Sequence, residues 1–488
     1  MTGRTRDLPV FPLSADPIRE GVPPTVQAVS GRFVAVGPEG GPRIGLVTLG
    51  CDKNTVDSER MMAALVGHGA RVTADVEGAD VIVINTCGFI QAAKEQSVET
   101  MLEACQLKEQ GQVQAVVAVG CMVQRYKSEL VEELPEVDLF LGLTELEKLV
   151  PALRERDLLP APEDVPIMER PLRVLSTATA HTSFLKISEG CDHTCAFCAI
   201  PLMRGLHRSH PVEDLVAEAR ALAEQGVREL NIVSQDTTWY GRDLKRHEGP
   251  GAPLLQDLLR ALLAGTDLPW HRLFYMYPSG ITRELVDLMA DESRILPYLD
   301  VPLQHGSDRI LMAMRRPERR DTIRERIGWL REAIADLTLR TTVIVGFPGE
   351  ADEDFDQLLG LLEEIRFDRV GAFMYSDEDG TRAADLPARV PQSLKRERME
   401  RLLDVQRGIS LEKNIDQIGR VVDAIIDQPA TDDPDFGWVA RTVGQALDVD
   451  GVTWLVDEPD RPQPQPGHIV AVEIVDGHEY DLVARLVD

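Results

Sequence analysis

The chain has 488 residues, of which 43% are hydrophobic, and carries a net charge of −29. Its length predicts two to four domains, and its acidity argues against a general nucleic-acid-binding protein, which usually has a basic surface. The sequence contains no run of about 20 apolar residues that could span a membrane. Its first 24 residues also lack the apolar segment of a secretory signal. We therefore expect a cytoplasmic protein whose seven cysteines are reduced thiols.

The N-terminal third predicts an α/β domain that follows an irregular extension. Residues 1–42 contain six glycines and seven prolines, so we expect no regular structure there. Strand and helix patterns then alternate, with strands at 43–49, 80–85 and 113–119 and helices at 55–69, 89–110 and 122–133. This alternation is typical of a doubly wound α/β sheet, which we place at 43–155. The charged segment 156–178, which contains four prolines, resembles a linker.

The rest of the chain predicts a partial parallel barrel and then a small β-barrel. Strands are expected at 183–188, 228–234, 271–276, 298–302, 338–346 and 369–375, with helical patterns between them. These six βα units predict a central partial barrel over 179–415 that ends in a helix at 391–415. Beyond it, short strands alternate with turn residues and no helical pattern intervenes, which predicts an all-β barrel at 416–488.

Three cysteines lie close together in EGCDHTCAFCAIP, residues 189–201. Cys191, Cys195 and Cys198 directly follow the first strand of the partial barrel, and active sites of parallel barrels lie where strands end. A zinc site would need a fourth ligand such as His193, and the spacing is not that of standard zinc modules. A disulfide would leave one thiol over. The remaining interpretation is a 4Fe–4S cluster with three protein ligands and one open iron.

A second set of cysteines follows the strands of the N-terminal domain. Cys51, Cys87 and Cys121 each come one to three residues after a predicted parallel strand, and each has a neighbouring glycine. Such positions meet at the carboxyl edge of an open α/β sheet, where ligands bind. The alternative is three unrelated buried thiols. We therefore predict a second cluster with an open iron, whereas Cys105, inside the helix at 89–110, is interpreted as a packing residue.

The C-x3-C-x2-C pattern after the first barrel strand resembles the radical S-adenosylmethionine superfamily. In that superfamily the open iron binds the methionine part of S-adenosyl-L-methionine, and one electron from the cluster cleaves the cofactor to give a 5′-deoxyadenosyl radical. The resemblance therefore makes Cys191, Cys195 and Cys198 the ligands of the catalytic cluster. Phe197 matches the aromatic residue usual in this motif; its alternative role is packing beneath the cluster.

Two clusters in this order, followed by a small β-barrel, resemble the methylthiotransferases. Family members combine an N-terminal cluster domain, a radical domain and a barrel called TRAM, and the resemblance covers roughly residues 43–488. They insert sulfur into an unactivated C–H bond and cap it with a methyl group. The resemblance gives the N-terminal cluster the role of holding the sulfur.

Several short sequences distinguish the branches of this family. GCDKN, NTCGFI and VPLQHGS resemble the RimO-type branch, which methylthiolates an aspartate of the basic ribosomal protein S twelve, with Lys53, Phe89 and His305 the most telling positions. The resemblance implies two 4Fe–4S clusters, S-adenosyl-L-methionine and an electron donor. One departure is His210, where the family usually has arginine. The alternatives are a tRNA methylthiotransferase and, in another class, a two-cluster electron-transfer protein, although such carriers usually use four cysteines per cube.

Other polar residues have both a functional and a structural interpretation. Gln235 and Gln304 end two barrel strands, where their amides can bind cofactor or substrate or can simply form a polar rim. Arg340 opens the fifth strand, so we expect a structural role. The arginines of residues 315–326 alternate with acidic residues, which favours a solvated helix face over a nucleic-acid patch.

The charge of the C-terminal barrel indicates which kind of substrate the protein binds. Residues 415–488 contain 16 acidic and four basic residues. Such a surface would repel a nucleic-acid backbone, because neutralisation of phosphates dominates that kind of binding, and it would attract a basic ribosomal protein. We therefore expect a protein substrate rather than tRNA; the alternative is that the acidic residues only keep the chain soluble.

Overall fold

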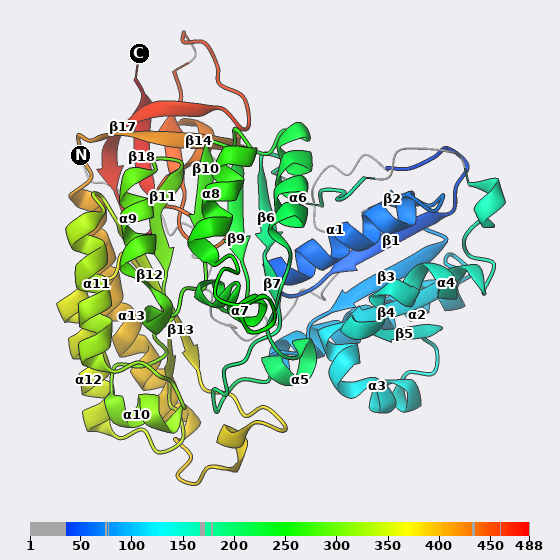
Figure 1. The fold of residues 1–488 in the computed structure, drawn as a ribbon, viewed down its shortest axis with the longest axis horizontal. Coiled ribbons are helices and arrows are strands. Elements are labelled where there is room, and N and C mark those ends of the chain that lie inside the picture. Colours follow the sequence, from blue (N-terminus) through cyan, green and yellow to red (C-terminus); the bar gives the residue numbers. More distant parts are fainter. Residues whose placement is uncertain are drawn as a thin grey trace.

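The structure is a computed structural model and describes residues 36–487 except 74, 75, 77, 166–170, 177, 178, 432–434 and 459. The extension predicted at 1–42 therefore lies, up to residue 35, outside the described residues. Figure 1 shows three parts: an N-terminal sheet with its helices, a central partial barrel, and a small β-barrel above the central part.

The N-terminal part is a parallel sheet in the order β2-β1-β3-β4-β5. Its strands are β1 (Arg43–Thr48), β2 (Arg71–Thr73), β3 (Val81–Thr86), β4 (Ala115–Gly120) and β5 (Leu139–Gly142), and its helices are α1 (Asp52–Val66), α2 (Gln91–Glu109), α3 (Cys121–Glu133) and α4 (Leu149–Arg154). Val81 and Val83 pack in one hydrophobic cluster and Ile82 and Ile84 in another, so helices cover both faces. The doubly wound α/β fold is confirmed; the edge strands β2 and β5, of three and four residues, were not predicted.

The central part is a partial barrel of parallel strands in the order β13-β12-β11-β10-β9-β6. These strands are β6 (Thr182–Lys186), β9 (Glu229–Val233), β10 (Trp270–Leu273), β11 (Ile295–Asp300), β12 (Thr338–Val345) and β13 (Arg369–Met374). The covering helices are α6 (Val212–Glu224), α7 (Arg242–Glu248), α8 (Leu255–Gly265), α9 (Arg283–Asp291), α10 (Asp308–Ala313), α11 (Arg320–Ala333), α12 (Asp352–Ile365) and α13 (Gln392–Ile415). This arrangement confirms the predicted radical-domain fold.

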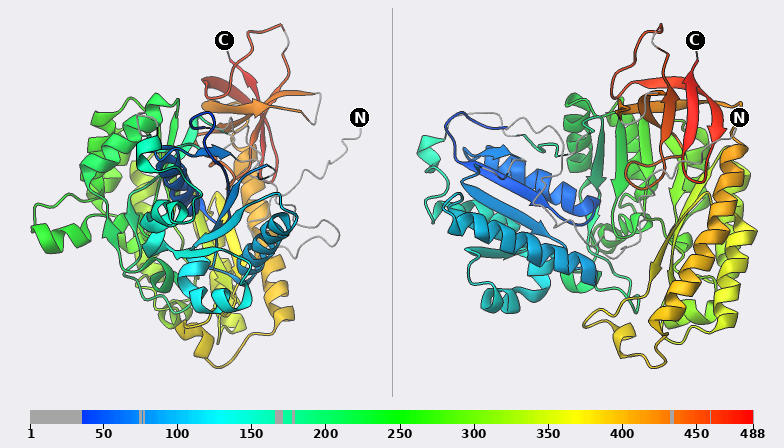
Figure 2. Two further views of the ribbon diagram at one scale, coloured as in Figure 1. Left: turned by 90° about the vertical axis from the view of Figure 1, so that its right-hand side faces the viewer. Right: turned by 180° about the vertical axis from the view of Figure 1, so that it is seen from behind.

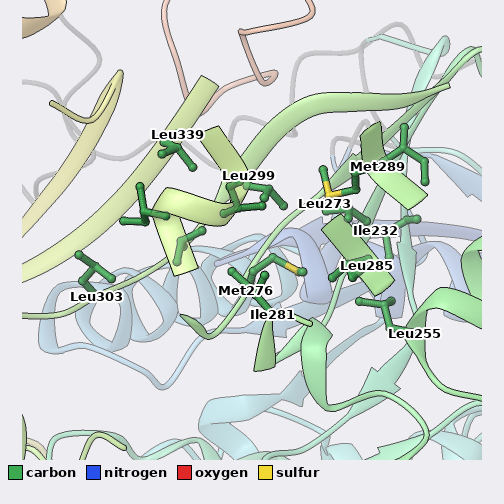
Figure 3. Packing of buried hydrophobic residues seen from close by; sticks show 14 of the residues in the cluster. Ile232, Leu255, Leu273, Met276, Ile281, Leu285, Met289, Leu299, Leu303 and Leu339 are labelled. Carbon is green, nitrogen blue, oxygen red and sulfur yellow. The ribbon is translucent and has the colours of Figure 1, made fainter. Parts of the chain in front are cut away.

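The hydrophobic core of the central part lies between these strands and helices (Figure 3). Ile232, Leu273, Leu299 and Leu339 come from four successive strands of the sheet and are fully buried. Their packing fixes the positions of the strand ends, and therefore of the loops that follow them. None of the helices in the part of the chain that the structure describes combines the length and apolar character that a bilayer span requires.

A short antiparallel ribbon follows the first barrel strand and was not predicted. It pairs β7 (Ser188–Glu189) with β8 (Arg208–Ser209) and encloses the loop with the three close cysteines and α5 (Ile200–Arg204). Two-residue strands carry no periodic pattern, so the sequence alone gives no sign of them. The ribbon closes the cysteine loop at its base.

The C-terminal part is the predicted small barrel, closed in the order β14-β15-β16-β18-β17. Its strands are β14 (Val421–Pro429), β15 (Phe436–Thr442), β16 (Thr453–Val456), β17 (Ile469–Gly477) and β18 (Leu482–Leu486). Ile425 packs with Trp270 and Leu296, which lie at the beginnings of β10 and β11. The barrel therefore covers the end of the central sheet where these strands begin, whereas α5 lies at the other end (Figures 1 and 2).

Candidate active site

The loop with Cys191, Cys195 and Cys198 lies between β7 and α5 and is anchored on both sides. The backbone N–H of Cys191 donates to Gly205 at 3.0 Å, and that of Ala196 donates to Met314 at 2.9 Å. Burial raises the pKa of the Cys191 and Cys198 thiols to about 12. Thiols so shielded from water stay protonated unless a positive centre, such as iron, replaces the proton.

His193, the fourth ligand that a zinc site would need, has other partners. Its Nε2 lies 2.7 Å from Asp236 Oδ2, and its ring stacks on Tyr277 with centroids 4.2 Å apart. Among the described residues, no three His, Cys, Asp or Glu side chains converge as the ligands of one metal ion would. A four-iron cube makes no such demand, because each thiolate binds a different iron. The geometry therefore does not support the zinc alternative.

The second set of cysteines lies at the carboxyl edge of the N-terminal sheet. Cys51 is the N-cap residue of α1 and Cys121 is the first residue of α3, so both cysteines lie where a helix begins at this edge. Gly50 has a φ of +100°, and a Cβ there would lie 3.0 Å from Cys87 Sγ. Burial raises the pKa of Cys121 to about 12 and also that of Cys87. The glycine thus lets the backbone pass close to a buried thiol.

A single asparagine connects the second set to the rest of the molecule. Asn54 Nδ2 donates to Leu49 and Thr86, at 2.6 and 3.2 Å, which fixes the orientation of the amide. Its Oδ1 accepts from Arg204 at 2.6 Å and lies 3.7 Å from Cys121 Sγ. Arg204 ends α5, the helix that begins two residues after Cys198.

Helix α5 therefore joins the two sets of cysteines. Ala199 and Met203 pack in the same hydrophobic cluster as Cys121, and α5 lies beside α3 in Figure 1. Since Ala199 is the chain neighbour of Cys198, the two sets adjoin. Sequence reasoning missed this link because Asn54 and Arg204 are 150 residues apart, and no spacing pattern relates them.

A buried network of charges surrounds Arg204. The guanidinium donates to Asp57 at 3.1 Å and to Glu189 at 2.8 Å, and Lys186 donates to the same two carboxylates. Although burial opposes its ionisation, Lys186 and Arg204 hold the pKa of Glu189 down at about 2. Asp57 lies on α1 of the N-terminal part, and Lys186, Glu189 and Arg204 lie in the central part. The network therefore joins the two parts beside the cysteine sites.

Gln235, Gln304 and Phe197 lie in different surroundings. Neither amide atom of Gln235 is exposed, and neither has a hydrogen-bond partner within the described residues, so its amide is available to a ligand. Gln304 has a φ of +75° and is held by its backbone, whose N–H donates to Thr342 at 2.9 Å. Phe197 is partly buried and packs against the hydrophobic cluster that contains Ala196 and Phe347.

The positions that indicate the RimO-type branch are Lys53, Phe89 and His305. Lys53 Nζ lies 3.3 Å from the ring centroid of Tyr275, which brings α1 onto the central part. Phe89 is 38% exposed. His305 is fully buried; Ser307 N–H donates to its Nδ1 at 3.0 Å, so Nε2 carries the proton and donates to Glu350 at 3.3 Å.

Two further residues that the sequence singles out are Arg340 and His210. Arg340 donates to Asp300 at 2.7 Å, in accord with the structural role expected for it. Burial lowers the pKa of His210, the departure from the usual arginine, to about 4, so the ring is neutral at neutral pH.

Cys105 lies apart from both sets. It is 6% exposed and packs with Met101 and Ala104 of α2, and burial raises its pKa to about 11. We expect Cys105→Ser to keep the full iron content of the anaerobically reconstituted protein and to cost about 1–3 kcal/mol of stability, because a hydroxyl enters an apolar contact. Iron analysis and thermal unfolding check this, with Cys105→Ala as the control that adds no hydroxyl. Loss of a large share of the iron in both variants would make Cys105 a ligand.

The three parts match three family models. Residues 43–142 match the Uncharacterized protein family UPF0004, residues 185–362 the Radical SAM superfamily, and residues 418–487 the TRAM domain. A solved radical S-adenosylmethionine methyltransferase, TsrM from Kitasatospora setae, is similar with a TM-score of 0.49 and 15% identity over 70% of this chain and 77% of that chain.

Curated relatives match nearly the whole chain. The ribosomal protein uS12 methylthiotransferase RimO of Anaeromyxobacter sp. (strain K) is 45% identical over 91% of this chain and 93% of its own length. The protein of the same name from Myxococcus xanthus is 43% identical over 91% of both chains. These matches confirm the predicted resemblance, exclude the electron-carrier alternative and do not favour the tRNA-modifying branch. The chain belongs to the RimO family of radical S-adenosylmethionine methylthiotransferases.

Proposed function

We propose that the protein inserts a methylthio group at the β-carbon of an aspartate in ribosomal protein uS12, the substrate named for its relatives. The observation that carries this proposal is the pair of three-cysteine sets that adjoin across α5. An enzyme that joins radical formation to sulfur transfer needs two such centres at one substrate position.

Each set of cysteines would hold one 4Fe–4S cluster. Cys191, Cys195 and Cys198 would hold the catalytic one, and Cys51, Cys87 and Cys121 the one that carries sulfur. When bound, the clusters supply an electron for cofactor cleavage and an iron site for the sulfur. The chain itself keeps water from the buried thiols and, through Arg204 and Asn54, fixes the two sets relative to each other.

The cofactor S-adenosyl-L-methionine would lie where the barrel strands end. Gln235 supports this placement, because a buried amide without a partner is costly unless a ligand satisfies it. Gln304 and Phe197 would complete the surroundings, Phe197 by packing. We divide the chain accordingly into a cluster domain at 43–155, a linker at 156–178, a radical domain at 179–415 and a TRAM barrel at 416–488.

The acidic TRAM barrel would recognise the basic ribosomal protein. Because this barrel packs where β10 and β11 begin, it would contact a part of the substrate remote from the target aspartate. Attraction between the two proteins would speed their encounter and weaken with salt. A ribosomal substrate agrees with the cytoplasmic location expected from the sequence.

Mass spectrometry of uS12 tests the proposed function. Ribosomes from cells that lack this chain should yield unmodified uS12, and complementation should restore a mass gain of one methylthio group on a single aspartate. A methylthio group on tRNA, with uS12 unchanged, would contradict the proposal and support the tRNA-modifying alternative.

A further inference from the structure

A groove lies beside the catalytic cysteine loop. It has a volume of about 610 Å³, and its lining includes Thr194 from the loop, Trp239 after β9, and Arg315, Arg316 and Arg319 between α10 and α11. Thr194 and Arg315 are exposed. The groove is therefore open to solvent at these two residues.

The inner wall of this groove touches a catalytic cysteine. Arg316 is almost fully buried; its Nη1 lies 4.0 Å from Cys195 Sγ, and its guanidinium stacks on Tyr277 at 3.7 Å from the ring centroid. The same arginine lines the groove. Only one side chain thus separates a molecule in the groove from a sulfur of Cys195.

Helix α7 adds positive charge beside the groove. Arg242, Lys245 and Arg246 are spaced i, i+3, i+4 and share one face of the helix. Arg242 stacks on Trp239 at 4.1 Å, and Arg246 pairs with Asp192 at 3.4 Å. This face is therefore turned toward the groove, and Lys245 is exposed on it.

The acidic residues near the groove already have partners. Asp192 pairs with Arg246 and also accepts from the backbone of His207 at 2.9 Å. Glu318 is fully buried and pairs with Arg316. The lining of the groove therefore holds three arginines and one acidic residue that is already paired, although the chain as a whole carries a net charge of −29.

We propose that this basic groove docks an acidic one-electron carrier protein that reduces the catalytic cluster. The inference rests on the proposed function. The carrier is oxidised by one electron and the cluster is reduced by one electron, and no bond is exchanged at the surface. Complementary charge speeds encounter and orients the partner, and a small interface suits a carrier that must leave after each transfer.

The position of the groove favours a carrier over an RNA phosphate backbone. The contact between Arg316 and Cys195 places the groove against the centre that needs the electron, a position that RNA binding does not require. RNA binding is an outcome that the test distinguishes.

The test uses the reconstituted holoenzyme and, as the acidic carrier, reduced flavodoxin. The groove variant combines Lys245→Glu with Arg315→Glu. The matched control reverses Arg156 and Arg485, two exposed arginines remote from the groove, so both variants lose the same charge. We expect the groove variant to bind flavodoxin at least about tenfold more weakly by calorimetry at low salt, and the control to bind within about twofold of the parent. Rapid-mixing spectroscopy should show slower cluster reduction only in the groove variant.

Chemical reduction separates this proposal from the proposed function. With dithionite in place of flavodoxin, the groove variant should cleave S-adenosyl-L-methionine as fast as the parent, because the small reductant needs no docking surface. Equal flavodoxin binding by the groove variant and the control would overturn the proposed docking surface. The same conclusion would follow if the groove variant lost binding to a ribosomal RNA fragment but kept its binding to flavodoxin. Failure of the parent to cleave the cofactor with dithionite would instead sink the proposed function.

Discussion

Combined replacement of Cys191, Cys195 and Cys198 by alanine is expected to abolish cleavage of S-adenosyl-L-methionine and to remove about half of the iron. The reason is that these thiols lie in one anchored loop, and no other cysteine lies in it. Iron analysis and detection of 5′-deoxyadenosine after dithionite reduction measure the two effects. Full iron content in this variant would show that the loop does not hold a cluster.

The reciprocal variant, with Cys51, Cys87 and Cys121 replaced by alanine, should also lose about half of the iron. It should still cleave the cofactor, because the catalytic loop keeps its own thiols and its bonds to Gly205 and Met314. Methylthiolation of uS12 should stop. The pair of variants therefore separates radical formation from sulfur transfer, and loss of cleavage in both would mean that the two sites do not act independently.

Much of the fold was predictable because its strands are long and apolar. β3 and β4 are buried along their whole length, and such runs read clearly as parallel strands. The cysteines could be placed for the same reason: the carboxyl ends of parallel strands meet at one edge, so three thiols that follow three strands come together.

The parts of the site that were missed depend on contacts between distant segments. Arg204 follows the cysteine loop directly, but its partners Asn54 and Asp57 lie on α1. Arg173, in the segment predicted to be a linker, is fully buried and bonds Glu59 and Glu218. No periodic pattern reports an ion pair formed between two domains, so only the packed structure identifies these residues.

Replacement of Arg204 or of Arg173 is expected to lower the stability of the protein. Arg204→Met leaves Asp57 and Glu189 with Lys186 as their remaining cation, and Arg173→Met removes the cation between Glu59 and Glu218. Breaking one partner of a buried charge network costs about 3–5 kcal/mol. Both variants should therefore unfold at lower temperature than the parent, by similar amounts.

Methylthiolation should distinguish the two variants. Arg204 bonds the Asn54 oxygen that lies 3.7 Å from Cys121 Sγ, whereas Arg173 joins the same two domains through Glu59 and Glu218. Per folded molecule, Arg204→Met should methylthiolate uS12 at least about tenfold more slowly than Arg173→Met. Arg204→Lys should restore only part of the rate, because an ammonium group cannot reproduce the planar fork that reaches Asn54, Asp57 and Glu189 together. Equal rates in both methionine variants would mean that Arg204 only holds the domains together and has no part in positioning the two cysteine sets.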